Sequence, residues 1–443
     1  MARKVFISFL GETNYGECDY QKDGISYGGK LRFIQEATLN YLNATNEWAK
    51  DDIAYILLTK GAEEKNWLDN GQTKYGSDEK IIQSGLQTQL RQMNLAFPVE
   101  PIKDIPEGND EREIWIIFEK IFDHIRDNDE LYFDVTHGYR YLPMLFLVLS
   151  NYAKFLKRVT VKSITYGNYE ISERGTKPGL IVDLLPLTVL QDWTYAAGQY
   201  LDSGNVERLK TLCNNELNPI LANSKGKNQD AQIMKRFIET LSDVIAERQT
   251  CRGMNIIQSK NFVKLKTYAD EIQTTLIPPL DPIFEKIKHS LVYFDEQENI
   301  KNGFSAAVWC YQNGLFQQAA TILQEFVVTF FCVKHNIKIE DENLRETVNS
   351  AFIIKFNGTV EKEWRGTEEQ KIKIREILSD DLLYNHSLVN YFNNLTEVRN
   401  DFNHSGMRSK RAPLSAVKIK DNIKKCIEGI ATILYNVNPL PLC

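Results

Sequence analysis

The chain has 443 residues, of which 43% are hydrophobic and 25% charged, and its formal net charge is −6. This length allows two or three domains with buried cores, and the acidic balance argues against a general nucleic-acid binder, so any such contact would need a local basic patch. No run reaches the roughly 18 apolar residues of a membrane span. The seven cysteines are scattered without a CxxC pair, which argues against a zinc site or disulfide framework and predicts a cytoplasmic location.

The N-terminal third alternates apolar strands with amphipathic helices. The apolar part of the first ten residues is too short for a signal peptide and ends at Gly11, so we expect a buried strand there. Strands are predicted at Lys4–Leu10, Ile53–Thr59, Leu131–Thr136, Val161–Tyr166 and Leu180–Leu187, the last two forming a candidate hairpin. Helices are predicted at Leu31–Tyr41, Ser77–Met93, Glu111–Arg126 and Leu142–Phe155. This alternation predicts an α/β domain with a mostly parallel, Rossmann-like sheet.

Two loops of this domain are candidates for ligand binding, because ligands of doubly wound sheets collect beyond the carboxyl ends of the strands. One loop follows the first strand, from Gly11 to Tyr27, and the other is Thr136-His137-Gly138-Tyr139-Arg140. Gly138 would let the backbone approach a ligand, the following helix offers free N–H groups, and Arg140 adds a cation. This chemistry suits a phosphate-bearing ligand, although an ordinary polar strand-to-helix turn is an equally good interpretation of the residues alone. The chain has neither GxGxxG nor GxxxxGK[ST].

Strand patterns stop after about residue 187, and the rest of the chain is predicted to be helical. Helices are expected at Gln191–Leu201, Asn205–Leu217, Ala231–Glu247, Lys260–Leu276, Ile283–Tyr293, Gly303–Lys334 with a joint at Gly314, Leu382–Val398 and Ala416–Tyr435. Glu325, on the apolar segment after Gly314, is interpreted as a solvated or paired charge rather than a catalyst.

Near the C-terminus, Arg399, Asn400 and His404 combine a fixed cation, a polar amide and an imidazole. Arg holds phosphates with a planar donor fork, and His moves protons near neutral pH, so the pair suits cleavage of a phosphodiester without a metal. Five residues turn an ideal helix by about 500°, which points the Arg and His side chains roughly 140° apart. A surface Arg and a capping His therefore remain the alternative interpretation.

A short basic run follows this segment, with Arg408, Lys410 and Arg411 within four residues. It is either a solvated loop or a contact for RNA phosphates.

Taken together, these features resemble the CARF–HEPN accessory ribonucleases of type III CRISPR systems. Arg399, Asn400 and His404 match the R-x4-H motif of HEPN domains, and Asp134-Val135-Thr136-His137-Gly138-Tyr139-Arg140 resembles the ligand loop of the CARF sensor. The resemblance covers the whole chain in layout. It implies a CARF domain over residues 1–187, an all-α connector over 188–300 and an all-α HEPN domain over 301–443.

The resemblance implies a single-stranded RNA endoribonuclease that is activated by cyclic oligoadenylate, with the tetra-adenylate favoured over the hexa-adenylate. The implied ligand residues are Leu10, Gly11, Thr13, Asn14, Thr136, His137, Gly138, Tyr139 and Arg140. Cleavage would need no metal or other cofactor and would leave a 2′,3′-cyclic phosphate. His404 would act as acid or base, Arg399 would stabilise charge on the phosphate and Asn400 would orient the substrate.

CARF domains dimerise around their ring, and HEPN domains pair to build one site from two motifs. The chain is therefore expected to form a homodimer or a higher oligomer of dimers, away from membranes, and the divergence of Arg399 and His404 would be resolved across an interface. Two other functions stay open. One is a non-catalytic sensor or transcription regulator, and the other is a sensor domain that itself degrades the ring.

Overall fold

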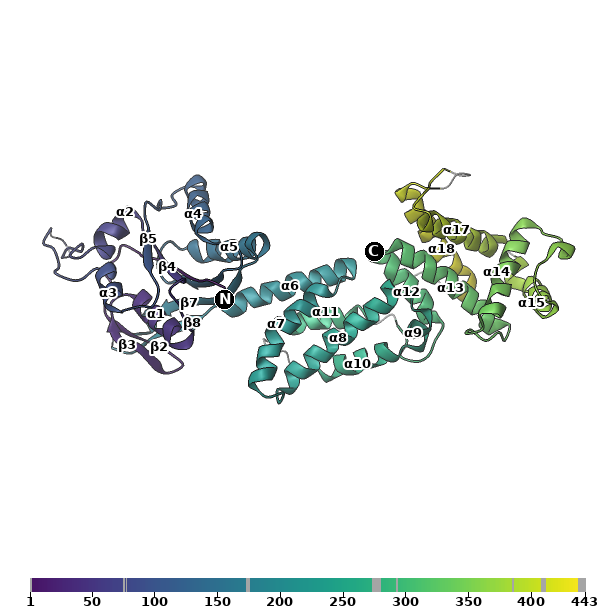
Figure 1. Ribbon diagram of the computed structural model, residues 1–443, viewed down its shortest axis with the longest axis horizontal. Coiled ribbons are helices and arrows are strands. Elements are labelled where there is room, and N and C mark those ends of the chain that lie inside the picture. The colour runs from purple at the N-terminus through teal and green to yellow at the C-terminus, as the bar shows by residue number, and fades with distance from the viewer. Residues whose placement is uncertain are drawn as a thin grey trace. The chain divides into compact units, whose positions relative to one another are not determined.

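The computed structural model of the protein describes residues 2–74, 76, 78–172, 176–272, 280–291, 294–384, 386–407 and 412–436. The chain forms two compact units, Met1–Val189 and Leu190–Cys443. The first is a mixed α/β domain and the second is helical throughout its described part (Figure 1). This confirms the predicted fold class, whereas the further division of the helical part at residue 300 stays a prediction.

The first unit is built on one eight-stranded sheet with the order β3-β2-β8-β7-β6-β1-β4-β5. Its strands are β1 (Lys4–Phe9), β2 (Cys18–Lys22), β3 (Ile25–Leu31), β4 (Ile53–Leu57), β5 (Val99–Ile102), β6 (Glu130–Asp134), β7 (Thr160–Asn168) and β8 (Gly179–Asp183). The five strands from β7 to β5 are parallel, and β8 returns antiparallel to β7 as the predicted hairpin. Since β1 lies between β4 and β6, the loops that follow β1 and β6 leave the sheet side by side.

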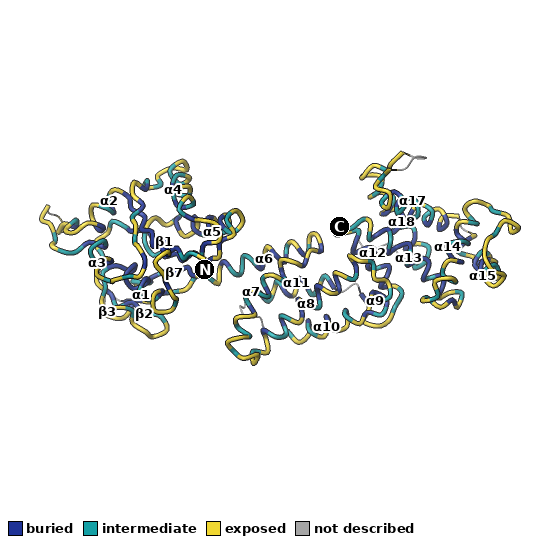
Figure 2. The backbone as a smooth tube through the Cα atoms, in the orientation of Figure 1, coloured by how far each residue is buried: buried dark blue, intermediate teal, exposed yellow. Residues whose placement is uncertain are grey.

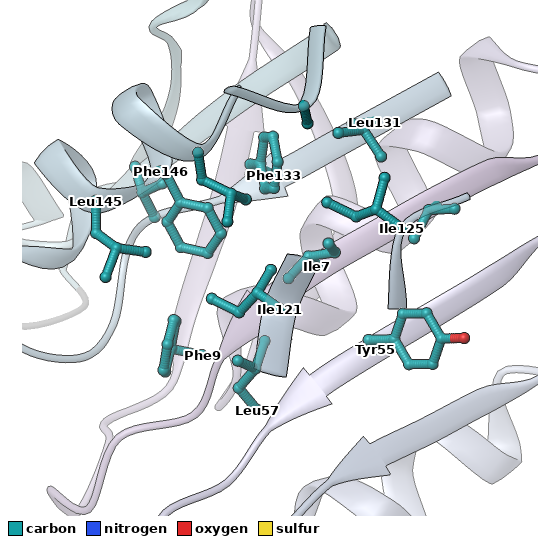
Figure 3. Close-up of a cluster of buried hydrophobic side chains, with 14 of the residues drawn as sticks. Ile7, Phe9, Tyr55, Leu57, Ile121, Ile125, Leu131, Phe133, Leu145 and Phe146 are labelled. Atoms are coloured by element: carbon teal, nitrogen blue, oxygen red, sulfur yellow. The ribbon is translucent and has the colours of Figure 1, made fainter. Parts of the chain in front are cut away.

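Helices cover both faces of the sheet because alternate residues of each buried strand point to opposite faces. On one face, Ile7 and Phe9 pack with Phe133 and with residues of α4 (Glu111–His124) and α5 (Leu142–Lys157), as Figure 3 shows. On the other face, Phe6 packs against α1 (Ile34–Thr45) and α3 (Leu86–Gln92). Strands β1 and β4 are buried along almost their whole length, and in Figure 2 the tube is dark blue at β1.

The region predicted as the loop Gly11–Tyr27 contains a β-hairpin instead. Strands β2 and β3 pair antiparallel around Asp23 and Gly24, which both have positive φ. An Asp-Gly pair is a strong signal for such a two-residue turn, so the hairpin could have been predicted from the sequence. The ligand loop after β1 is therefore short, and it ends where β2 begins at Cys18.

The predicted helix Ser77–Met93 is wrong over most of its length. The helix begins at Leu86, and Ser77 itself lies outside the described residues. Gly85 is held against another segment: its N–H donates to Asp69 Oδ1 at 2.6 Å, and a Cβ there would lie 2.3 Å from the carbonyl oxygen of Trp67. The chain is thus pinned in an extended conformation up to Gly85. Two further elements were not predicted: α2 (Lys60–Ala62) and the π-helix η1 (Glu63–Trp67).

The sequence predicted most helices of this unit in their order, but not those at Gly253–Gln258, Glu342–Asn357 and Glu368–Leu378. The described part of the unit contains the following helices. They are α6 (Leu185–Ser203, which starts in the first unit), α7 (Glu207–Asn223), α8 (Gln229–Gln249), α9 (Gly253–Gln258), α10 (Lys260–Glu271), α11 (Asp281–His289), α12 (Lys301–Gln312), α13 (Phe316–Lys334), α14 (Glu342–Asn357), α15 (Glu368–Leu378), α16 (Asp381–Tyr384), α17 (His386–Asn403) and α18 (Ala416–Tyr435). The predicted ends at Leu276 and Tyr293 lie outside the described residues. Helix α13 packs against α12, α14, α17 and α18.

Among the described residues, α13 alone is long and apolar enough to cross a membrane by length and composition. Most of it is buried inside the helical unit (Figure 2), which is equally typical of the core helix of a globular domain. The count of consecutive apolar residues did not identify it because Gln324 and Glu325 interrupt the run.

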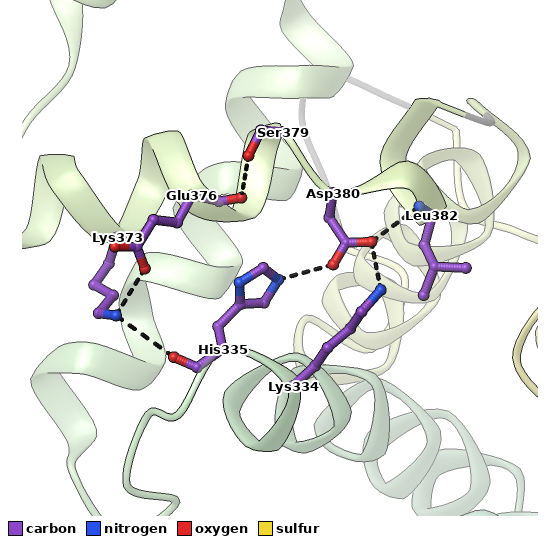
Figure 4. A network of polar contacts seen from close by, with 7 residues as sticks. All are labelled: Lys334, His335, Lys373, Glu376, Ser379, Asp380 and Leu382. Atoms are coloured by element: carbon purple, nitrogen blue, oxygen red, sulfur yellow. Dashed lines mark hydrogen bonds and ion pairs between the residues drawn. The ribbon is translucent and has the colours of Figure 1, made fainter.

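A buried carboxylate joins the end of α13 to the segment between α15 and α16 (Figure 4). Asp380, only 7% exposed, accepts hydrogen bonds from Lys334 Nζ at 2.7 Å, His335 Nε2 at 2.9 Å and the N–H of Leu382 at 3.0 Å. Burial by itself raises the pKa of Asp380, but the bonds from Lys334, Leu382 and His335 outweigh it and lower the pKa below its ordinary value.

We expect Asp380→Asn to destabilise the helical unit by about 2 kcal/mol at neutral pH, because it weakens bonds to a charged acceptor. Since the folded-state pKa of Asp380 is lowered, this contribution is fully present above roughly pH 4 and is lost as the pH falls through the folded-state pKa. Urea unfolding across pH, with the transition assigned by hydrogen exchange in α13, measures the difference. Glu376→Gln, which breaks the exposed Lys373–Glu376 pair, is the matched control with little effect. Equal losses in both variants would contradict the assignment.

Candidate ligand pocket and candidate ribonuclease site

A pocket of about 420 Å³ lies where β1 and β6 end. Among the predicted ligand residues, those lining it are Leu10, Gly11, Thr13, Thr136, His137, Gly138 and Tyr139. Asn14 and Arg140 are exposed and lie outside the lining. The structure thus brings together the two loops that the sequence singled out, in the position expected for the carboxyl ends of neighbouring parallel strands.

A buried polar network fixes the two loops relative to each other. Asp134, which is fully buried, accepts hydrogen bonds from Ser8 Oγ of β1 at 2.7 Å and from Thr136 Oγ1 at 2.5 Å. Thr136 Oγ1 in turn accepts the N–H of Gly167 in β7 at 2.7 Å. Burial raises the pKa of Asp134, and the bonds from Thr136 and Ser8 oppose this shift. The role of Thr136 in the described structure is therefore to hold the loop, with its hydroxyl already bonded inside the protein.

The backbone conformation at position 138 requires a glycine. Its φ is +106°, and a Cβ at this position would lie 2.3 Å from Leu142 Cδ1 and 3.4 Å from Phe9 Cβ. Any side chain would thus be strained and would collide with the start of α5. The backbone at Gly138 therefore passes close to Phe9 at the end of β1, at the base of the pocket.

His137 packs its ring on Tyr15, with ring centroids 4.2 Å apart and an angle of 27° between the rings. Burial lowers the pKa of His137 to about 4, so the imidazole is neutral at physiological pH. Its Nε2 is buried and has no hydrogen-bond partner. A neutral imidazole nitrogen either donates or accepts a hydrogen bond, so this buried atom has an unused bonding capacity among the described residues, and the stacked Tyr15 holds the ring in place.

The segment after β4, which was not predicted to contribute to the pocket, adds Thr59 to its lining, and η1 holds the neighbouring loop in place. Thr59 and Glu12 both line the pocket. The side chain of Asn66 in η1 donates to the carbonyl oxygens of Gly11 and Thr13, both at 2.8 Å, and Gln72 donates to the carbonyl oxygen of Glu12 at 3.0 Å. The loop after β1 is therefore clamped along its backbone. A π-helix is frequent at functional sites, but no residue pattern in the sequence identified one here.

The charge of the pocket lining differs from the expectation. Among the described residues, the lining contains the carboxylates of Glu12 and Glu107 but no Lys or Arg. Arg140 is exposed and makes no hydrogen bond or ion pair within the described part of the chain. A phosphate could therefore meet Arg140 only at the rim of the pocket, and the interior suits the uncharged parts of a ligand.

The candidate ribonuclease residues lie at the end of α17. Arg399 Nη1 donates to Gln324 Oε1 of α13 at 2.7 Å and lies 3.5 Å from Glu325 Oε1. The other oxygen of Glu325 pairs with Arg345 of α14 at 2.9 Å. Glu325 is thus a paired charge, which is one of the two states predicted for it from the sequence. Arg has five N–H donors, so these contacts orient Arg399 and still leave donors for a phosphate.

His404 lies just beyond α17 and is exposed. Its N–H donates to the carbonyl oxygen of Asn400 at 3.1 Å, so helical geometry continues to this residue, and the helix then ends with positive φ at Ser405 and Gly406. The calculated divergence of about 140° between Arg399 and His404 therefore applies, and one chain does not bring the two side chains together. Asn400 lies beside Arg399 and is partly exposed. The predicted RNA contacts Arg408, Lys410 and Arg411 lie outside the described residues.

Comparisons with known proteins find a family match in the first unit. Residues 5–170 match the family model described as the CARF domain of the CRISPR system endoribonuclease Csx1. The CRISPR-associated protein MJ1674 of Methanocaldococcus jannaschii is 23% identical over 470 residues, covering 98% of this chain, and the chain spans only 66% of the length of that relative. Enterococcus italicus Csm6 bound to cyclic hexa-2'-fluoro-hexa-dAMP superimposes with a TM-score of 0.43 and 12% identity, covering 98% of this chain and 94% of that one.

The matched segment begins inside β1 and ends after β7, so it includes both loops that form the pocket. The family model thus identifies the first unit as a CARF domain, as the sequence predicted, and over its length the chain is similar to a CRISPR-associated protein.

Proposed function

We propose that this protein is a single-stranded RNA endoribonuclease that is activated by a cyclic oligoadenylate bound at its CARF domain. The observation that carries the proposal is the match of residues 5–170 to a CARF domain of an endoribonuclease, joined to an R-x4-H segment whose His404 is exposed at a helix end. The ligand site is the pocket between the β1 and β6 loops. The nuclease site is formed by Arg399, Asn400 and His404.

The proposed reaction is attack of a ribose 2′-OH on the adjacent phosphate, which leaves a 2′,3′-cyclic phosphate and a 5′-OH. His404 moves the proton at the attacking or leaving oxygen, a role that contributes on the order of 10²–10⁴-fold. Arg399 stabilises the charge that develops on the phosphate, and Asn400 orients the substrate. No metal takes part. Because Arg399 and His404 diverge within one chain, each active site combines residues of two copies.

The size of the pocket supports a ring shared between copies. A volume of about 420 Å³ fits a drug-sized molecule, so one chain would hold only part of a ring of four or six nucleotides. We favour the tetra-adenylate over the hexa-adenylate, and we place the ring on the two-fold axis of a homodimer in the cytoplasm.

Helix α5 offers a face for that pairing, starting beside the ligand loop. Met144, Val148 and Phe155 are 67%, 52% and 83% exposed, and their spacing places them on one side of the helix. A soluble chain gains by covering such an apolar stripe. Since α5 begins immediately after the ligand loop, a contact along this face would put two pockets next to each other.

We expect His404→Ala to abolish RNA cleavage while ring binding is unchanged, because the imidazole supplies the proton transfer and lies outside the CARF domain. The assay follows cleavage of a labelled single-stranded RNA in EDTA, with cyclic tetra-adenylate present. His386→Ala is the matched control, since His386 is exposed at the first position of the same helix. Cleavage by His404→Ala at the parent rate would remove His404 from the site, and a strict need for Mg²⁺ in the parent protein would contradict the mechanism.

Arg140→Ala should weaken activation, raising the ring concentration for half-maximal RNA cleavage by about tenfold, since a charge-assisted bond to a phosphate is worth roughly 1.5–3 kcal/mol. Cleavage at saturating ring should stay at the parent level. The control is Arg112→Ala, which removes one positive charge from an exposed position of α4 outside the pocket lining. Unchanged ring affinity in Arg140→Ala would contradict the contact at the rim.

Val148→Asp should convert the dimer to a monomer at micromolar concentration, because it places a charge in the centre of the apolar face of α5. Sedimentation velocity measures the change, and ring binding and RNA cleavage should fall with it. Ile82→Asp, at an exposed apolar position outside this helix, should leave the protein dimeric. A dimeric Val148→Asp protein with full activity would exclude α5 as the interface.

A further inference from the structure

The pocket as described has the wrong charge for the phosphates of its proposed ligand. Glu12 and Glu107 contribute carboxylates, and no Lys or Arg belongs to the lining. His137 adds no positive charge, because its imidazole is neutral at physiological pH. A phosphodiester entering beside Glu12 would meet a like charge, which weakens binding when it is not relieved.

The cation that could relieve it lies directly behind Glu12. Lys65 Nζ of η1 is 2.8 Å from Glu12 Oε2, and Thr59 Oγ1 donates to Glu12 Oε1 at 3.1 Å. Both carboxylate oxygens are therefore occupied, and the bond from Lys65 is the main cause of the lowered pKa of Glu12. Lys65 has no other partner among the described residues.

The carboxylate also occupies a place that an anion would take. A Cβ at Gly61 would lie 2.3 Å from Glu12 Cδ, so the absence of a side chain at Gly61 makes room for the carboxylate. Around that space lie a hydroxyl from Thr59 and an ammonium from Lys65. A hydroxyl, an ammonium and an uncrowded backbone are groups that recognise a phosphate oxygen as well as a carboxylate.

We propose that Glu12 is an internal substitute for a ligand phosphate, and that a phosphodiester of the ring displaces its side chain and takes over Lys65 and Thr59. Lys65 thereby becomes a ligand-binding residue that the free protein keeps neutralised. This inference rests on the proposed cyclic oligoadenylate ligand and adds a cationic subsite to it. An uncharged or cationic ligand would leave the Glu12–Lys65 pair intact, so the exchange also selects for an anion.

The surrounding contacts allow the exchange without refolding the loop. The carbonyl oxygens of Gly11, Glu12 and Thr13 are held by the side chains of Asn66 and Gln72. The backbone at Glu12 is thus fixed, and only its side chain has to rotate. Glu12 and Lys65 are both partly exposed, so the released carboxylate can turn towards water.

Binding of cyclic tetra-adenylate and cyclic hexa-adenylate to the full chain, measured by isothermal titration calorimetry, tests the exchange. Glu12→Gln should tighten binding by about tenfold, because its uncharged amide no longer neutralises Lys65, and Lys65→Met should weaken binding by about tenfold. The control pair is Glu63 and Lys103, whose ion pair of 2.6 Å also involves η1 but lies outside the pocket lining. Glu63→Gln and Lys103→Met should leave the affinity at the parent value.

The double variant separates the exchange from a general loss of negative charge. If Glu12 acts by masking Lys65, the gain from Glu12→Gln becomes much smaller in the Lys65→Met background. An equal gain in both backgrounds would overturn the exchange in favour of simple repulsion, and weaker binding by Glu12→Gln would show that the carboxylate contacts the ligand itself. In either case ring binding by the parent protein would leave the proposed sensing function standing. If the parent protein binds neither ring, the proposed ligand fails and the inference fails with it.

Discussion

The pairing of β1 with β6 is the constraint on which the ligand site depends. Ser8 and Asp134 are opposite each other in this parallel pair, and both are fully buried. The hydrogen bond between their side chains links the ends of the two strands. A shift of one residue in either strand would turn every apolar side chain to the wrong face. It would also remove the hydrogen bond that Ser8 of β1 donates to the buried Asp134 carboxylate. The same register that builds the core therefore sets the distance between the two ligand loops.

Much of the first unit could be predicted from its sequence because its signals are local. The strands around Ile7, Ile56 and Phe133 are short apolar runs that end in Gly or polar residues, and they were placed within a residue or two. The helix predicted from Ser77 failed because Gly85 is held by contacts with Asp69 and Trp67, which are tertiary and leave no periodic pattern. For the same reason the contribution of Lys65 and Asn66 to the pocket was not predicted. Both residues contact the loop after β1, which is more than fifty residues away in the sequence.

In the helical unit, the motif residues were readable from the sequence but their surroundings were not. The spacing of Arg399 and His404 on one helix, and their divergence, follow from helix geometry alone. That Arg399 would bind Gln324, and would share Glu325 with Arg345, depends on how α13, α14 and α17 pack. In the described structure, Arg399 and Lys65 each lie beside a protein carboxylate, that of Glu325 and that of Glu12 respectively.

The π-helix η1 makes two contacts of the loop after β1 depend on one extra residue. The N–H of Leu68 bonds the carbonyl oxygen of Glu63, five residues back, so the turn contains one residue more than an α-helical turn. Removing one residue would rotate the side chains beyond the deletion by about 100° relative to those before it. The clamp on the β1 loop and the cation behind Glu12 come from neighbouring positions of this turn, so they would be lost or kept together. A deletion within this turn would therefore change both contacts at once.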